Sequence, residues 1–274
     1  MSALTLFVTG AASGIGAQLT GRLLRAGHRV VAADVQEAAL AARAKDDAWP
    51  TDKVLLQHLD VRKEDDWETA LNRAESTLGA LDVMMNVAGV LLPGYAHEVK
   101  TSDVDLQVDV NVKGVILGTR AAAKRMARRG RGHIVNIGSL CSLAPIPGLT
   151  VYSATKFAVR GFTLAAAEDL RPLGIKVTVV MPDAVTTPML KLQEAYDEAA
   201  LAFSGSRPLQ PEEVVRVLVE QVLPKQPLEV TIPDGRGAIA RAVNSAPQLA
   251  NMLLPIFRSL GKRNQERIRR QNAS

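Results

Sequence analysis

The stretch that decides the fold spans residues 4–16 and reads Leu-Thr-Leu-Phe-Val-Thr-Gly-Ala-Ala-Ser-Gly-Ile-Gly. An apolar run typical of a buried strand passes directly into a glycine-rich loop. A helical pattern of leucines continues to Gly27, and a second strand-like run ends at Asp34. Glycines let a backbone approach a phosphate closely, and the next helix offers free N–H groups and a positive dipole. A strand, glycine loop, helix and strand within about 30 residues form a unit that binds a dinucleotide.

Asp34 stands at the end of the second predicted strand, where a carboxylate can accept hydrogen bonds from the adenosine ribose. The same carboxylate would repel a 2′-phosphate, and the neighbouring Ser13 and Val35 carry no positive charge to offset that repulsion. We therefore predict NAD rather than NADP as the cofactor. A solvent-facing acid at a strand end is the simpler alternative.

The rest of the chain alternates between strand-like and helical patterns. Further strands are expected at residues 54–59, 83–87, 133–137, 175–181 and 229–232. Helices are expected at residues 64–78, at about 103–128 and in a segment that ends near Leu170. This alternation predicts an α/β domain with a doubly wound parallel sheet of about seven strands and helices on both faces.

In such a sheet, ligands bind beyond the carboxyl ends of the strands. Six residues of chemical interest fall at predicted strand ends: Gly10, Asp34, Asp60, Asn86, Ser139 and Pro182. We therefore expect them to line one rim of the sheet.

Asn111 lies inside the helix predicted over residues 103–128. Asparagine is a poor helix former because its side chain competes for backbone hydrogen bonds. Its position predicts either a kink or a functional role.

Tyr152 and Lys156 are four residues apart, a spacing that places both on one face of a helix. A phenol loses its proton near pH ~10, and a nearby cation lowers that value. A shift to near ~7 requires about 4 kcal/mol at 1.36 per unit. Most such pairs are ordinary helix surface, but beside a ligand the pair can transfer a proton.

Together these motifs resemble the short-chain dehydrogenase/reductase family over residues 4–235. The glycine loop has the spacing Gly-x-x-x-Gly-x-Gly, not the more common Gly-x-Gly-x-x-Gly. The matching motifs are Thr9-Gly10-x-x-x-Gly14-Ile15-Gly16, Asp60-Val61, Asn86-x-Ala88-Gly89, Asn111, Ser139, Tyr152-x-x-x-Lys156 and Pro182-x-x-Val185-x-Thr187.

The resemblance implies a Rossmann-type fold and hydride transfer with a nicotinamide cofactor. It makes Tyr152 the general acid/base and Ser139 a hydrogen-bond donor to the substrate oxygen. It also implies that Lys156 lowers the pKa of Tyr152 and holds the nicotinamide ribose, and that Asn111 completes a water-linked proton relay. The expected cofactor-binding residues are Gly10, Ser13, Gly14, Ile15, Gly16, Asp34, Asp60, Val61, Asn86, Ala88, Gly89, Tyr152, Lys156, Pro182, Val185 and Thr187.

Three positions depart from the family pattern. Val87 replaces an asparagine and removes a side-chain hydrogen bond, whereas Gly138 replaces a common serine without an expected effect. Asp183 replaces the usual glycine after Pro182, where it would stiffen the loop, approach the cofactor or face solvent. None of the three removes a catalytic group.

The segments expected around the substrate are mostly apolar, which favours an apolar ligand. Ser139, Leu140, Leu149, Tyr152 and Met189 are the expected substrate contacts. We predict a lipophilic secondary alcohol or ketone; a packed mobile lid, or a small polar alcohol or sugar as substrate, is the alternative. A non-catalytic nucleotide sensor is a further alternative. The apolar residues in these segments are Leu91, Leu92, Leu140, Leu143, Ile146, Leu149, Met189, Leu190, Leu192 and Phe203.

Composition limits the class of protein. The single cysteine, Cys141, excludes an internal disulfide framework and fits a reducing compartment, so a cytoplasmic location is expected. We expect neither a signal peptide nor a membrane span, because no stretch reaches ~18 apolar residues. Basic clusters occur at residues 124–131 and 262–270, but without interleaved aromatics they do not predict nucleic-acid binding. No metal site is expected.

Residues 1–237 are expected to form the NAD-binding catalytic domain, and residues 238–274 an amphipathic, basic extension. The extension predicts a helix interrupted at Pro247 and Pro255. Such a helix would contact its own protein, a partner subunit in a homodimer or homotetramer, or a membrane surface. Its apolar residues are Ile239, Val243, Leu249, Leu253, Leu254, Ile256, Phe257 and Leu260.

Overall fold

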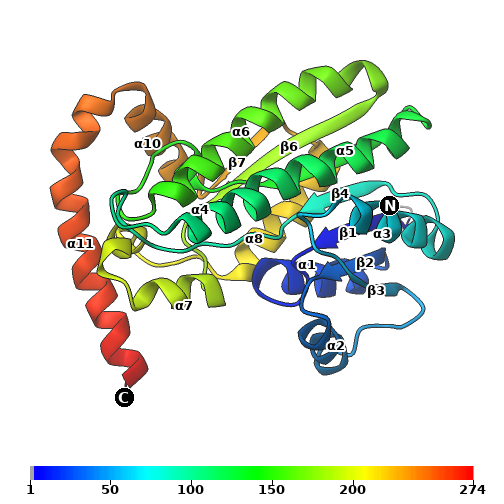
Figure 1. Ribbon diagram of the computed structural model, residues 1–274, viewed down its shortest axis with the longest axis horizontal. Coiled ribbons are helices and arrows are strands. Elements are labelled where there is room, and N and C mark those ends of the chain that lie inside the picture. The colour runs from blue at the N-terminus through cyan, green and yellow to red at the C-terminus, as the bar shows by residue number, and fades with distance from the viewer. Residues whose placement is uncertain (1–2, 274) are drawn as a thin grey trace.

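Across residues 3–273, which the computed structural model describes, seven parallel strands form a sheet in the order β3-β2-β1-β4-β5-β6-β7 (Figure 1). The strand order reverses between β1 and β4, which opens a crevice at their carboxyl ends. The predicted doubly wound parallel sheet is confirmed. The strands are β1 (Thr5–Thr9), β2 (Arg29–Asp34), β3 (Val54–His58), β4 (Val83–Asn86), β5 (Gly132–Ile137), β6 (Ile175–Pro182) and β7 (Glu229–Ile232).

Helices cover both faces of the sheet because alternate side chains of each strand point to opposite sides. In β1, Leu6 and Val8 pack with α1, α2 and α8, whereas Phe7 packs with α3, α5 and α6. Both layers are fully buried, which holds the carboxyl ends of the strands rigidly in place. These helices are α1 (Gly14–Arg25), α2 (Glu37–Asp46), α3 (Glu64–Leu78), α5 (Gly114–Ala127), α6 (Thr150–Leu170) and α8 (Pro211–Val217).

The predicted helix over residues 103–128 consists of three parts. α4 (Thr101–Val108) leads into a π-helical turn, η1 (Asp109–Lys113), and α5 follows. Asn111 lies in this turn, so the predicted irregularity is confirmed. The sequence patterns did not predict α2, whose single buried residue, Leu40, leaves little hydrophobic periodicity.

The chain beyond β6 builds an outer wall beside the crevice. In Figure 1, α11 is the long helix at the edge of the molecule, next to α7. The helices here are α7 (Pro188–Glu194), the 3₁₀ segment η4 (Asp197–Phe203), the π-helical turn η5 (Leu218–Val222), α9 (Leu223–Lys225), α10 (Asp234–Ser245) and α11 (Pro247–Ala273).

The extension differs in part from its prediction. Pro247 begins α11 as expected, but Pro255 lies inside the helix and does not end it. The boundary expected at residue 238 falls inside α10. The side chains of Leu249 and Leu253 lie outside the described residues. Over residues 3–273, every helix is too short or too polar to cross a membrane.

Candidate active site

A cavity of about 900 Å³ lies at the carboxyl ends of the strands. The glycine loop and the first turn of α1 form one part of it, and α6, α7, α10 and α11 form the other. All the predicted cofactor residues except Asn86 line this cavity: Gly10, Ser13, Gly14, Ile15, Gly16, Asp34, Asp60, Val61, Ala88, Gly89, Tyr152, Lys156, Pro182, Val185 and Thr187.

Two glycines of the loop are required by close backbone approach. Gly10 has φ of +69°, and a Cβ there would lie 2.9 Å from Cα of Ala88. A Cβ at Gly16 would lie 2.1 Å from the carbonyl oxygen of Gly10. Neither position accepts a side chain, so the loop stays tight and presents bare backbone to the cavity. This cradle fits the pyrophosphate of a dinucleotide.

Asp34 and Asp60 line the cavity with their carboxylates held in place. Oδ2 of Asp34 accepts a hydrogen bond from the amide of Ala12 at 3.0 Å, and Oδ1 accepts one from the amide of Gln36 at 3.0 Å. Asp60 accepts two bonds from the Arg62 guanidinium, at 2.9 and 2.8 Å, and Arg62 lowers the pKa of Asp60. The guanidinium of Arg62 is therefore engaged by an acid.

Asn86 is the predicted cofactor residue that the structure turns away from the cavity. Its Nδ2 donates to Oδ1 of Asn136 at 2.8 Å and to Oγ1 of Thr119 at 3.3 Å. The side chain is buried between β4, β5 and α5, so it supports the strand ends from behind. The amides of Val87 and Ala88 instead donate to Oγ1 of Thr9, both at 3.0 Å.

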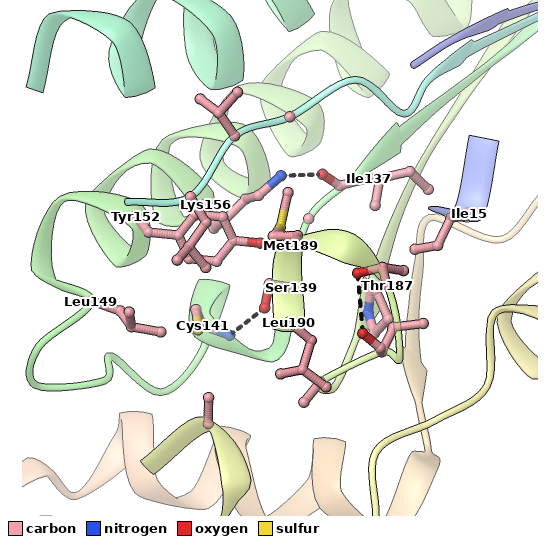
Figure 2. A pocket seen from close by; sticks show the side chains of 18 of the residues that line it. Ile15, Ile137, Ser139, Cys141, Leu149, Tyr152, Lys156, Thr187, Met189 and Leu190 are labelled. Carbon is pink, nitrogen blue, oxygen red and sulfur yellow. Dashed lines mark hydrogen bonds between the residues drawn. The ribbon is translucent and has the colours of Figure 1, made fainter. Parts of the chain in front are cut away.

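Tyr152, Lys156 and Ser139 converge inside the cavity (Figure 2). Tyr152 and Lys156 lie one turn apart on α6, and Ser139 directly follows β5. Nζ of Lys156 donates to the carbonyl oxygen of Ile137 at 2.9 Å and lies 5.5 Å from the centre of the Tyr152 ring. Oγ of Ser139 accepts a hydrogen bond from the amide of Cys141 at 3.2 Å and faces the phenol.

The pKa shifts differ from the prediction for this pair. Burial raises the pKa of the Tyr152 phenol, the Cys141 thiol adds to the increase, and a hydrogen bond with Ser139 opposes it. Burial also lowers the pKa of Lys156 to about 8. The predicted lowering of the Tyr152 pKa by Lys156 is therefore wrong for the protein alone. Desolvation is the largest cause of the shift for both side chains, and Lys156 is not among the causes of the Tyr152 shift.

Asn111 is fully buried and does not line the cavity. Its amide accepts from the Val90 amide and donates to the Val90 carbonyl, both at 2.8 Å, and also donates to Oγ1 of Thr155 at 3.1 Å. The π-helical turn thus ties the loop after β4 to the helix that carries Tyr152. The structure assigns Asn111 a positioning role; its part in a proton relay stays a prediction.

Asp183 is paired rather than solvent-facing. Its carboxylate contacts Nε of Arg236 on α10, and its side chain is only 15% exposed. Burial raises the pKa of Asp183, and the Arg236 cation opposes this increase. Both side chains line the cavity, so the departure from the family pattern links the end of β6 to the C-terminal extension.

The substrate side of the cavity is mainly apolar. The predicted contacts Ser139, Leu140, Leu149, Tyr152 and Met189 all line it, as do Leu91, Leu92, Ile146, Leu190 and Leu192. Leu143 and Phe203 are buried in the protein and do not reach it. Sequence reasoning missed the lining residues that come from α10 and α11: Arg236, Ile239, Ala240, Val243, Asn244, Leu254 and Phe257. Their amphipathic pattern was visible, but nothing in it indicated which surface the apolar face would cover.

Comparisons with known proteins agree with this geometry. The family model for short chain dehydrogenases matches residues 4–197. A 3-alpha-(or 20-beta)-hydroxysteroid dehydrogenase of Mycobacterium tuberculosis is 38% identical over 182 residues, which cover 66% of this chain and 69% of the relative. A cyclopentanol dehydrogenase of Comamonas testosteroni is 33% identical over 218 residues, which cover 78% of this chain and 87% of the relative.

Solved structures share the architecture. A short-chain type dehydrogenase/reductase from Mycobacterium marinum superposes with a TM-score of 0.74 at 26% identity, covering 83% of this chain and 93% of that one. The chain belongs to the short-chain dehydrogenase/reductase family. It is an oxidoreductase with a nucleotide-binding Rossmann fold.

Proposed function

We propose that this protein is an NAD-dependent dehydrogenase that interconverts a lipophilic secondary alcohol and its ketone. The observation that carries the proposal is the convergence of Ser139, Tyr152 and Lys156 on a cavity that also contains the glycine cradle. The family's chemistry needs a proton donor or acceptor beside the carbinol oxygen and a nicotinamide beside the carbinol carbon. A protein that only senses nucleotides would not need the proton donor or acceptor.

Each catalytic side chain has a defined task in this mechanism. Ser139 hydrogen-bonds the substrate oxygen and orients it toward the Tyr152 hydroxyl. Tyr152 donates its proton to the oxygen during ketone reduction and accepts it during alcohol oxidation. When bound, NAD supplies the hydride acceptor and, in its oxidised form, a positive charge.

The raised pKa keeps the Tyr152 phenol protonated in the protein without cofactor, the form from which ketone reduction starts, and also makes the phenol a weaker acid. For alcohol oxidation the phenol needs a positive charge nearby that offsets the desolvation. We propose that Lys156 holds the nicotinamide ribose, which keeps the ammonium and the cofactor next to the phenol. The glycine cradle would hold the pyrophosphate, and Asp34 the adenosine ribose.

The lining of the cavity supports a lipophilic substrate. Leucine, isoleucine and methionine side chains line the substrate side together with Ser139, Tyr152 and Lys156, and the Arg236 guanidinium that lines the cavity is paired with Asp183. The relatives are named for a steroid alcohol and a cyclic alcohol. A steroid, a terpenoid or another cyclic alcohol fits this surface better than a sugar.

A screen of alcohols and ketones by nicotinamide absorbance, with NAD and NADP in parallel, tests the proposal. We expect turnover of cyclopentanol and of a hydroxysteroid with NAD, and none of sugars. Faster turnover of sugars would refute the lipophilic substrate. Binding of NADH without turnover of any alcohol or ketone would favour the nucleotide sensor.

We propose that the protein works in the cytoplasm as a homodimer or homotetramer. The outward face of α11 supports a partner, because Met252, Ile256 and Leu260 are 74%, 65% and 44% exposed at helical spacing. Arg263 and Arg267 continue the same exposed face. Light scattering of the full chain and of Ile256→Glu measures the oligomer. If the chain is monomeric and sediments with phosphatidylglycerol vesicles but not with phosphatidylcholine vesicles, this face contacts a membrane surface instead.

A further inference from the structure

The inward face of α11 holds the segment from α7 to η4, residues 188–203, through side-chain amides. Gln265 is 2% exposed, and its Nε2 lies 3.0, 3.4 and 2.8 Å from the carbonyl oxygens of Gln193, Glu194 and Tyr196. An amide nitrogen has two protons to donate, so the three carbonyls share them. Each carbonyl also accepts a second hydrogen bond, from the amides of Tyr196 and Ala199 or from Nε of Arg269. What Gln265 adds is therefore a direct link to α11. One side chain of the extension thus fixes the turn that follows α7.

Residues of α11 that precede Gln265 hold the middle and the far end of the same segment. Nδ2 of Asn264 donates to the carbonyl oxygens of Phe203 and Gly205 at 3.0 and 3.2 Å. A Cβ at Gly261 would lie 2.1 Å from the carbonyl oxygen of Ala200, so α11 touches the backbone of η4 directly. The segment is fixed at its start, middle and end.

That segment forms part of the cavity wall. Met189, Leu190 and Leu192 of α7 and Leu201 of η4 line the cavity from one side. The extension itself contributes further apolar wall: Ile239 and Val243 from α10, and Leu254 and Phe257 from α11. The same helix therefore supports the segment on one face and encloses the cavity beside it.

The extension lies outside the residues that the family model matches. The family model ends at residue 197, before the last turn of η4. The glycine loop, Ser139, Tyr152 and Lys156 all fall within the matched region. α7 also falls within the matched region, whereas α10 and α11 lie beyond it.

We propose that the C-terminal extension determines which substrates the enzyme accepts. Leu254 and Phe257 contact the substrate at the end distant from Tyr152 and limit its size. Gln265 is a positioning residue that holds α7 and η4 against the substrate. This inference rests on the proposed function only in that a substrate alcohol must occupy the cavity.

Two variants test the two parts of the proposal. In Phe257→Ala, the added space should raise kcat/KM for a hydroxysteroid about tenfold and lower it for cyclopentanol by about the same factor. In Gln265→Met, which keeps the length but removes the donors, KM for both alcohols should rise about tenfold. In both variants kcat and the Kd for NADH should stay within about twofold of wild type. Glu266→Gln, at the exposed residue next to Gln265 on α11, is the matched control and should change none of these values.

A measurement independent of turnover separates this inference from the proposed function. Lys191 is an exposed trypsin site on α7, and mass spectrometry can follow its cleavage in the full chain. Gln265→Met should speed that cleavage about tenfold and Glu266→Gln should not. If no alcohol is turned over but Gln265→Met still speeds cleavage, the proposed substrate is wrong, whereas the role of Gln265 in holding α7 and η4 is supported. If alcohols are turned over and neither Phe257→Ala nor Gln265→Met alters selectivity, KM or cleavage, the inference is wrong.

Discussion

The cofactor side and the substrate side of the cavity are built by different physical means. The cofactor side is backbone: a glycine loop that excludes any Cβ, strand ends locked between two buried layers, and carboxylates held by main-chain amides. The substrate side is mostly side chains on short helices, held in place by a distant helix through Gln265 and Asn264. Backbone geometry tolerates little variation, whereas a side-chain wall can be replaced piece by piece. The residues of the cofactor side fall within the family match at residues 4–197, whereas α10 and α11 of the substrate side lie beyond it.

Removal of the Tyr152 hydroxyl should have the largest effect, because it lies where the two sides meet. In Tyr152→Phe we expect kcat to fall by about 10³-fold. The Kd for NADH should change by less than about twofold, because the cofactor side is backbone. Tyr196→Phe, at a tyrosine that is 38% exposed and does not line the cavity, is the control. Substantial turnover by Tyr152→Phe would show that the phenol is not the proton donor and acceptor.

The cofactor side can be tested at its charged end. Asp34→Asn keeps the size of the side chain but removes the charge that would repel a 2′-phosphate. We expect the preference for NAD over NADP, measured as the ratio of kcat/KM values, to fall about 30-fold, since hydrogen bonds to a charged group contribute about 2 kcal/mol. A wild-type enzyme that already prefers NADP would contradict the role given to Asp34.

The stability of the sheet beneath both sides should decrease in acid because of His133. Burial on β5 lowers the pKa of His133 to about 4, and its Nε2 lies 2.9 Å from Oγ1 of Thr178. The folded protein keeps the ring neutral, whereas the unfolded chain takes up a proton below the ordinary pKa of about 6.5. Stability is therefore present above pH ~6.5 and is lost as pH falls toward ~4.

Urea unfolding at two pH values measures this loss. Between pH ~7.5 and ~5.0 we expect His133 to reduce the free energy of unfolding by about 2 kcal/mol. His133→Gln, which can still pair with Thr178, should show a smaller pH dependence by that amount. An unchanged pH dependence would show that the ring does not titrate on unfolding in this range.

The smallest effect is expected where Asp183 and Arg236 link the two sides. Arg236 is partly exposed, so the pair should contribute only about 1 kcal/mol. A double-mutant cycle of Asp183→Gly and Arg236→Gln, read by urea unfolding, measures this coupling. Asp183→Gly restores the family's usual residue, so turnover with NAD should persist. A coupling near zero would mean that α10 is held by its apolar contacts alone.

Much of the cofactor side could be predicted from the sequence because its signals are local. The glycine spacing, the strand before it and Asp34 at the next strand end each constrain only nearby backbone. The same holds for Tyr152 and Lys156, whose shared helix face follows from their spacing. The direction of the Asn86 side chain could not be predicted in this way, since it depends on Asn136 and Thr119 from other elements.

By itself, the sequence determined the doubly wound sheet, the family and the residues placed to transfer a proton. Only the tertiary structure decided the electrostatics of Tyr152 and the identity of the far wall. The pKa of the phenol depends on how much water the fold removes, and burial is the largest cause of its increase here. The amphipathic pattern of residues 238–274 predicts a helix with an apolar face, but the surface that this face covers is set by packing across the chain.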